Sequence, residues 1–492
     1  MESAATAGRR RVSADRLGEL ARRVPLGLAI VLVLGIELRL ALWFAYEPSV
    51  QTLLDTVVYV GMADGELFSD PARGAGYSIF LRAMHLISDQ VAFTIAVQHL
   101  LGLGTALLLY GGFRRLDAPV WVGVVAAAGV LLSLDQIFLE HTIFTESLFT
   151  FLLALSLYAA IRFLDEPRPL WGPLTTRHAW ILAAAVALGL AGWTRSVVVP
   201  MLPLFAIWFA LAAGGAWRVR LGRAALAGGA VALVMVGYAG LQSAHNGFFG
   251  LSKSTGWAMY ARTAQFADCT RFDPPAGTED LCESIPPAER PGPDFYAWVD
   301  GSPARDLYGG HPNGNEELNS FAQAAILGQP WDYAKTVTID SLRYFWPGLD
   351  SRPYGGVGIS VLDIDRRNPV EAEVGAALDR YYADETLEVG GLAGALADVQ
   401  DVLRIQWWTM IVFAVLGACA LLLARGRLRW GIVLMLGTSA ALLVIPPATA
   451  IWSARYAVPL TGPMAGAAAV GAWLLYRRLR ERRAGAAERV ES

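Results

Sequence analysis

Charged and polar side chains gather in a few short segments between long apolar stretches. Asp55 and Tyr59 lie one helical turn apart shortly after the first stretch, and Glu140, His141 and Glu146 lie between two later ones. A partly desolvated carboxylate is a suitable general base, because loss of water raises its affinity for a proton. Ionisable residues at one membrane depth are costly unless they pair or bind something, so these residues suggest a polar cleft.

Two further turns of the same kind carry arginines. Arg195 follows Trp193-Thr194, and Arg455 follows Trp452-Ser453-Ala454. A guanidinium offers a planar fork of hydrogen-bond donors and keeps its charge when partly desolvated, so both arginines are candidates to clamp a phosphate. Their alternative role is to reach from helix ends to the membrane interface. A third candidate for the phosphate is Lys253. The candidates for substrate contact are Tyr59, His141 and Tyr456.

The elements that position these residues are long apolar helices. The chain has 492 residues, is 55% hydrophobic and has a mean hydropathy of +0.42, which is more apolar surface than one or two soluble cores can bury. We predict an all-α polytopic membrane protein with about ten transmembrane helices. The expected spans are 25–46, 91–113, 119–138, 143–163, 179–194, 197–214, 224–243, 406–424, 431–447 and 456–475.

Arginines mark alternate ends of these spans, which sets their direction. One set of ends carries the arginine clusters at 9–23, 114–115, 162–177, 218–223, 425–429 and 477–483. The short turns at the other ends carry only Arg73, Arg82, Arg195 and Arg455. Because basic residues are enriched on the cytoplasmic side of membrane proteins, both termini are expected in the cytoplasm. Only two of the 40 basic residues are lysines, which favours a GC-rich genome and a bacterial plasma membrane.

Three regions follow from this topology. Residues 1–243 form an N-terminal transmembrane module with a first outer loop at 47–90, and residues 244–405 form an extracytoplasmic loop subdomain of α or α+β type. Residues 406–492 form the C-terminal transmembrane helices and a basic cytoplasmic tail. Cys269 and Cys282 lie in the outer subdomain, where an oxidising compartment favours a disulfide between them. Two unpaired thiols are the alternative.

Four motifs resemble the GT-C superfamily of polyprenyl-phosphate-sugar-dependent glycosyltransferases, in its protein O-mannosyltransferase and lipid A aminoarabinose transferase branch. Asp55 with Tyr59 and Ala63 resembles the acidic motif of the first outer loop. Residues 74–81 (GAGYSIFL) are similar to the interfacial helix that follows it, Thr145-Glu146-Ser147-Leu148 to the second acidic site, and Gly192-Trp193-Thr194-Arg195 to the arginine turn.

The resemblance implies an enzyme that moves a sugar from a polyprenyl-phosphate donor to an acceptor hydroxyl at the outer face, with inversion and with Asp55 as base. It implies no cofactor and no metal, and membrane lipids as surroundings. This sequence departs from the pattern in two places. No second acid stands beside Asp55, so Glu146 or Glu140 is the candidate to assist it, and both usual prolines are missing around Tyr77. The segment 244–405 matches only generically, which leaves the acceptor undefined.

Other classes of function have weaker support. The six histidines lack the paired spacing of a zinc site, and a packing role for His141 is the alternative to catalysis. No glycine-rich loop follows a strand and opens a helix, so we expect no nucleotide site and no nucleic-acid partner. The main rival is a polytopic transporter or lipid-linked-sugar flippase, although the candidate residues gather at the outer face rather than at mid-membrane. A non-catalytic scaffold is a second rival.

Overall fold

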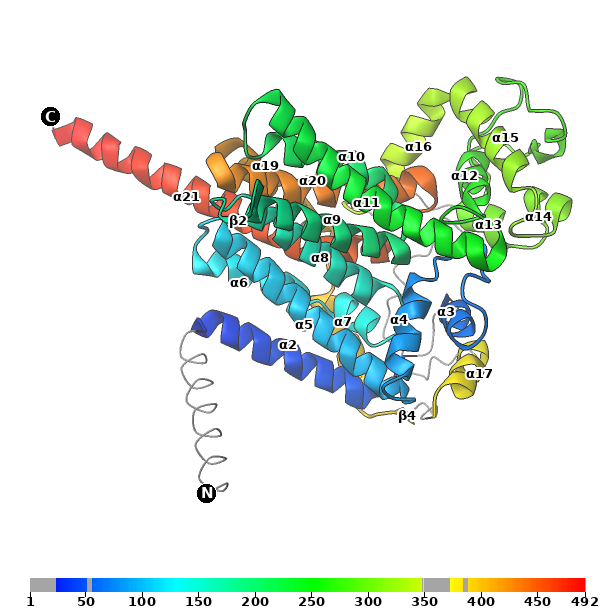
Figure 1. The fold of residues 1–492 in the computed structure, drawn as a ribbon, viewed down its shortest axis with the longest axis horizontal. Helices are drawn as coiled ribbons and strands as arrows, with labels where there is room; N and C mark the ends of the chain where they lie inside the picture. The colour runs from blue at the N-terminus through cyan, green and yellow to red at the C-terminus, as the bar shows by residue number, and fades with distance from the viewer. Residues whose placement is uncertain (1–23, 51–54, 347, 349–371, 384–387, 492) are drawn as a thin grey trace.

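The computed structural model describes residues 24–50, 55–346, 348, 372–383 and 388–491, so the basic segment at 9–23 lies outside the described residues. The chain is mostly helical, and its long helices run side by side (Figure 1). These are α2 (Leu26–Ala45), α5 (Val91–Arg115), α6 (Val120–Leu131), α7 (Leu134–Glu140), α8 (Glu146–Phe163), α9 (Thr176–Thr194), α10 (Leu202–Leu211), α11 (Trp217–Asn246), α19 (Trp407–Leu423), α20 (Gly426–Thr449) and α21 (Thr461–Glu491), with the 3₁₀ turns η1 (Ser196–Met201) and η5 (Ala454–Leu460).

Seven of the described helices are long and apolar enough to cross a membrane, and eight if the bent pair α6 and α7 is one span. The bend between α6 and α7 is 55°, where Ser133 caps the new helix by accepting from the Gln136 amide. The predicted spans at 179–194 and 197–214 correspond to α9, which carries Arg177 in its first turn, and to the ten-residue α10. The count of about ten therefore stays a prediction.

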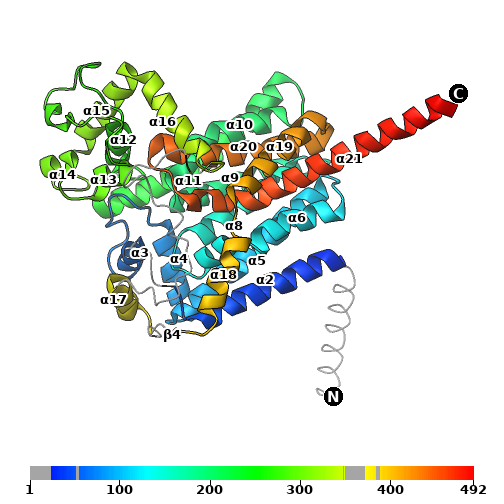
Figure 2. The same ribbon diagram turned by 180° about the vertical axis from the view of Figure 1, so that it is seen from behind.

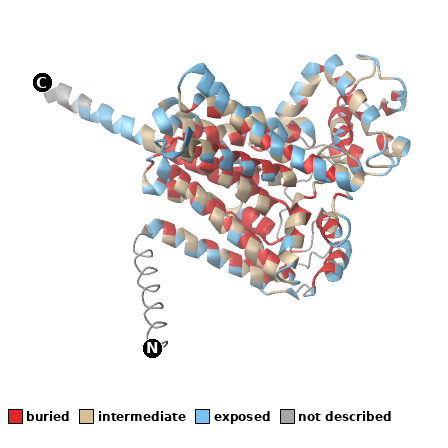
Figure 3. Ribbon diagram, in the orientation of Figure 1, coloured by how far each residue is buried: buried red, intermediate tan, exposed pale blue. Residues whose placement is uncertain are grey.

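The exposed apolar side chains identify lipid as the surroundings of this bundle. Leu26, Leu233 and Leu422 are 76%, 72% and 84% exposed, and such surfaces are stable when lipid rather than water covers them. Figure 3 shows buried residues along the middle of the bundle and exposed residues on its outer helices. The protein is thus embedded in a membrane through several apolar helices.

The shorter elements lie at one end of the bundle, opposite the end where α2 begins and α21 ends (Figures 1 and 2). They are α3 (Asp55–Asp64), α4 (Gly76–His85), α12 (Thr255–Ala264), η2 (Glu279–Leu281), α13 (Pro293–Trp298), α14 (Pro303–Tyr308), α15 (Asn315–Gly328), α16 (Pro330–Leu342), α17 (Ala372–Tyr381), α18 (Ala393–Leu403) and the antiparallel pair β1 (Tyr46–Glu47) and β4 (Glu388–Val389). The hairpin β2 (Pro169–Trp171) and β3 (Leu174–Thr175) joins α8 to α9. We call this crowded end the outer end, after the side on which the topology expected from the sequence places it.

Two separate cores divide the interval 244–405. Helices α12 to α15 enclose a core of their own around Trp257 and Phe321. Val374 of α17 and Leu396 of α18 instead belong to the core that α2, α3, α4 and α5 share. Helices α12 to α15 therefore form a small helical unit at the outer end, which we call the outer unit. Helices α17 and α18 pack instead against the bundle.

Candidate active site

Asp55 is the centre of an ion-pair cluster at the outer end. It is the first residue of α3, and its Oδ1 accepts from Arg73 Nε at 2.9 Å and from Arg73 Nη2 at 2.5 Å. Its Oδ2 lies 3.4 Å from Nη1 of Arg455. The carboxylate is thus held between two guanidiniums that come from distant parts of the chain, and its side chain stays 24% exposed.

Arg455 joins this pair to a second carboxylate. Its Nε lies 3.7 Å from Oε1 of Glu146, the first residue of α8. Glu146 also pairs with Arg195, and its Oε2 accepts from the Thr145 hydroxyl at 3.0 Å. Four of the residues singled out in the sequence therefore meet, together with Arg73. We call Arg73, Asp55, Arg455, Glu146 and Arg195 the outer cluster.

Aromatic rings form one wall of the outer cluster. The ring of Tyr456 lies 4.7 Å from the Arg195 guanidinium carbon and 5.4 Å from that of Arg455. Phe144 covers Arg455 at 4.9 Å, and Tyr59 meets Phe144 edge-on with centroids 6.1 Å apart. Cations over aromatic faces are stabilised when water is partly excluded. Tyr59 and Tyr456 thus lie beside the charged groups, and their contact with a substrate stays a prediction.

Local chain geometry brings the arginines together. The Asp70 carboxylate accepts from the amides of Ala72 and Arg73 at 2.9 and 2.6 Å, which fixes the turn that presents Arg73. Gly74 and Gly76 then pass against the backbone of Trp193. A Cβ on Gly74 would lie 2.7 Å from the Trp193 carbonyl oxygen, and one on Gly76 would overlap the same group. The small residues of the Gly-Ala-Gly motif thus allow α4 to sit on the end of α9, next to Arg195.

The guanidiniums of the outer cluster are groups that bind anions. Three guanidiniums lie close together here, and they pair with the carboxylates of Asp55, Glu146 and Asp70. Burial raises the pKa of the Asp55 carboxyl, but Arg455 and Arg73 outweigh this effect and hold that pKa below its ordinary value. A phosphate bound here could accept hydrogen bonds from all three arginines. It would compete with Asp55 for two of them, Arg73 and Arg455.

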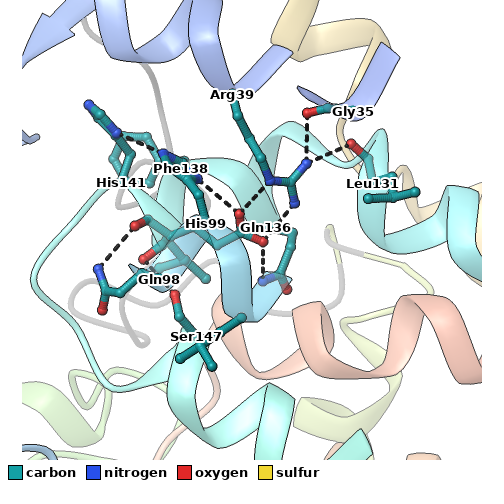
Figure 4. Close-up of polar contacts among 12 residues, drawn as sticks. Gly35, Arg39, Gln98, His99, Leu131, Gln136, Phe138, His141 and Ser147 are labelled. Carbon is teal, nitrogen blue, oxygen red and sulfur yellow. Dashed lines mark hydrogen bonds and ion pairs between the residues drawn. The ribbon is translucent and has the colours of Figure 1, made fainter. Parts of the chain in front are cut away.

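Glu140 and His141 belong to a different, fully buried network (Figure 4). Arg39 donates to both oxygens of Glu140 at 2.8 Å. His99 Nδ1 lies 3.0 Å from Glu140 Oε2, and Gln136 donates to Oε1 at 3.0 Å. Glycine is required at position 102, because a Cβ there would overlap the Glu140 carboxylate. None of the described contacts of Glu140 reaches the outer cluster, which it was expected to assist.

Two histidines continue this network beyond Glu140. His99 Nε2 lies 3.0 Å from His141 Nδ1, and His141 Nε2 lies 2.7 Å from the Tyr46 carbonyl oxygen. These contacts link Glu140 through two imidazoles to Tyr46 at the end of α2.

The buried network also fixes the turn that carries Phe144 and Glu146. Gln98 donates to the carbonyl oxygens of Glu140 and Thr142 at 3.0 and 2.9 Å. The Thr56 hydroxyl donates to the Ile143 carbonyl at 3.0 Å. These bonds connect the turn to α5 and α3, so the network positions one side of the outer cluster.

Lys253 and the cysteines lie outside the outer cluster. The Lys253 ammonium contacts the Asn246 carbonyl at 3.5 Å and the ring of Phe248 at 5.4 Å, while its backbone amide donates to Pro71. Lys253 therefore supports the 70–73 turn through its backbone. Cys269 and Cys282 form a disulfide with Cα atoms 6.0 Å apart.

Sequence reasoning assigned no role to Arg73, which makes the shortest contact to Asp55. One feature of the sequence could have indicated Arg73. Asp70 lies three residues before it, and an Asp at this spacing often fixes a turn by accepting from the backbone amides that follow. Within the described residues, no group of three or more His, Cys, Asp or Glu side chains has the arrangement of a metal site. No protein-family model and no curated protein matches this sequence.

Proposed function

We propose that this protein is a membrane-embedded, inverting glycosyltransferase that moves a sugar from a polyprenyl-phosphate donor to an acceptor hydroxyl at the outer face. The observation that carries the proposal is the position of Asp55 between Arg73 and Arg455, with Glu146 and Arg195 continuing the same network. A base next to several phosphate-binding groups is what transfer from a lipid phosphate requires.

Binding of the sugar donor would activate the base. The phosphate competes for Arg455, Arg195 and Arg73, because bidentate guanidinium–phosphate pairs are strong when partly desolvated. Asp55 then stays desolvated while the arginines stabilise its negative charge less, so the affinity of its carboxylate for a proton rises. The base is thereby strengthened only when the sugar donor is in place.

The transfer step balances with these residues alone. Asp55 takes the proton of the acceptor hydroxyl while the acceptor oxygen attacks the anomeric carbon from the face opposite the phosphate. The bond between the anomeric carbon and the phosphate oxygen breaks, and its electron pair leaves with the lipid phosphate. The arginines stabilise this departing anion. The products are an inverted glycoside and a polyprenyl phosphate.

The proposal includes an orientation. The outer cluster faces the extracytoplasmic side of a bacterial plasma membrane, and both termini lie in the cytoplasm. The support is that arginines gather at the opposite ends of the helices. A lipid-linked sugar would enter sideways from the outer leaflet.

The test is donor turnover by the purified full-length protein, with a panel of polyprenyl-phosphate sugars and release of polyprenyl phosphate as the readout. Asp55→Asn is expected to slow turnover by roughly two to four orders of magnitude. Asp64→Asn, the same substitution at the exposed end of the same helix, is the matched control and should turn over like the wild type. Full activity of Asp55→Asn, or no turnover with any sugar donor, contradicts the proposal.

The arginines give a second test. Arg455→Ala and Arg195→Ala each remove a charged hydrogen-bonding group and should raise the KM for the sugar donor roughly tenfold or more. Arg455→Lys keeps the charge without the fork and should fall between wild type and alanine. Unchanged donor KM in all three variants would remove these arginines from the phosphate site.

One observation favours a second function, a proton-coupled transporter or flippase for a lipid-linked sugar. The Arg39, Glu140, His99 and His141 network is buried among apolar helices, and buried ionisable residues of this kind form proton relays in membrane transporters. The discriminating experiment is reconstitution in liposomes with a fluorescent polyprenyl-phosphate sugar. Pumping that depends on a pH gradient and is lost in His99→Gln would favour the transporter.

A further inference from the structure

Helix α13 of the small outer unit faces the outer cluster. Its Tyr296 and Ala297 belong to the unit's own core. Asp294 and Trp298 are one helical turn apart and therefore share the other side of this short helix. The guanidinium carbon of Arg73, the partner of Asp55, lies 5.1 Å from the centroid of the Trp298 ring. The unit thus brings an acid and a large ring next to the proposed base.

Trp298 is both exposed and rigidly supported. Its side chain is 44% exposed, although it stacks on His311 with ring centroids 4.4 Å apart and an interplanar angle of 16°. His311 stacks in turn on the fully buried Trp257 at 4.4 Å. His311 Nε2 also bonds to the Ala297 carbonyl at 3.1 Å. His311 thus supports the indole at low cost in conformational entropy, and the Arg73 guanidinium also lies over the ring. The apolar surface offered to a ligand is the exposed part of the ring that these two side chains leave uncovered.

Asp294 is a partly exposed carboxylate on the same side of α13 as Trp298. It makes no hydrogen bond and no ion pair with any residue that the structure describes. Burial raises the pKa of its carboxyl to about 6, which the surrounding arginines oppose only in part. The charged groups that act on it are Arg455, Arg262, Arg343 and Asp55. Asp294 therefore lies near the outer cluster, which supplies two of these groups.

The geometry points to α13 as the acceptor subsite and to a carbohydrate as the acceptor, with a sugar ring stacked on Trp298 and its hydroxyls donating to Asp294. The transfer step of this inference rests on the proposed function. A pyranose or furanose has an apolar C–H face and an edge of hydroxyl donors, which match a flat ring flanked by a carboxylate. An extended peptide would instead be recognised through a row of backbone hydrogen bonds, whereas the stacking surface of Trp298 suits a sugar ring.

Direct binding tests the subsite without any turnover. The full-length protein in lipid nanodiscs is titrated with di- to tetrasaccharides of mannose, glucose, galactose and arabinose, and with serine- and threonine-containing peptides, with saturation-transfer NMR as the readout. Trp298→Ala should weaken binding of at least one oligosaccharide roughly five- to tenfold, and Asp294→Asn roughly threefold or more. Trp298→Phe should fall between alanine and wild type. Trp331→Ala is the matched control, because Trp331 is 83% exposed at the start of α16.

The outcomes separate the subsite from the enzyme. Wild-type affinity for every bound oligosaccharide in Trp298→Ala, binding of no oligosaccharide, or Trp298-dependent binding of peptides instead would overturn the inference. Hydrolysis of the sugar donor by the wild-type protein without acceptor is measured in parallel. Hydrolysis together with Trp298-independent binding would leave the proposed function standing and refute the subsite. Trp298-dependent oligosaccharide binding without any use of a sugar donor would support the subsite and refute the transferase.

Discussion

Replacing Glu140 by glutamine should strongly destabilise the protein. The side chain of Glu140 is fully buried, and it neutralises Arg39 through two bonds of 2.8 Å. Glutamine has nearly the same volume and keeps one acceptor, so no cavity forms and the lost charge is the main change. Removing one partner of a buried ion pair costs about 3–5 kcal/mol, because the other charge stays buried without compensation. We expect a loss of that size.

The measurement is reversible unfolding in mixed micelles of increasing SDS content, followed by circular dichroism. Glu66→Gln is the matched control, since Glu66 is exposed in the first outer loop, and it should unfold like the wild type. The double variant Arg39→Met with Glu140→Gln removes both charges and should recover roughly 1.5 kcal/mol or more of the loss in a double-mutant cycle. A single variant Glu140→Gln within about 0.5 kcal/mol of the wild type would refute the buried ion pair.

Three further predictions concern other parts of the molecule. Gly102→Ala should destabilise the protein by about 1–3 kcal/mol in the same unfolding experiment, because its Cβ would overlap the Glu140 carboxylate; Gly237→Ala, with open space around it, should not. Replacing Cys269 and Cys282 by serine should lower the free energy of unfolding of the outer unit by about 3 kcal/mol. Limited proteolysis should then cut faster near residues 265–300 while the bundle stays intact, and an unchanged rate of cleavage would contradict this. Oligosaccharide affinity should rise from pH 5 to pH 7 with a midpoint near the Asp294 pKa of about 6. The reason is that the carboxylate present above that pH is a stronger hydrogen-bond acceptor than the carboxylic acid. An Asp294→Asn variant with the same pH profile as the wild type would contradict this.

Several features follow from local sequence. Apolar runs place the long helices, because the requirement for about 20 apolar residues in a membrane span is a property of a single segment. The described helices α2, α5, α8, α11, α19 and α20 overlap the expected spans. Turns such as Thr145-Glu146 and Thr194-Arg195 were also readable, since they interrupt apolar runs with charges that lipid does not tolerate.

Only the tertiary structure decided which of these charges meet. Glu140 and Glu146 are six residues apart, yet Glu140 ends α7 facing Arg39 and His99 while Glu146 begins α8 facing Arg195. The break between the two helices turns their side chains to different neighbours, and no pattern along the chain records that rotation. The contact of Arg73 with Asp55 also depends on tertiary packing, because the segment that carries Arg73 leads into α4, which packs on the end of α9. Hydropathy is set residue by residue, whereas an ion pair depends on the packing of helices that are distant in sequence.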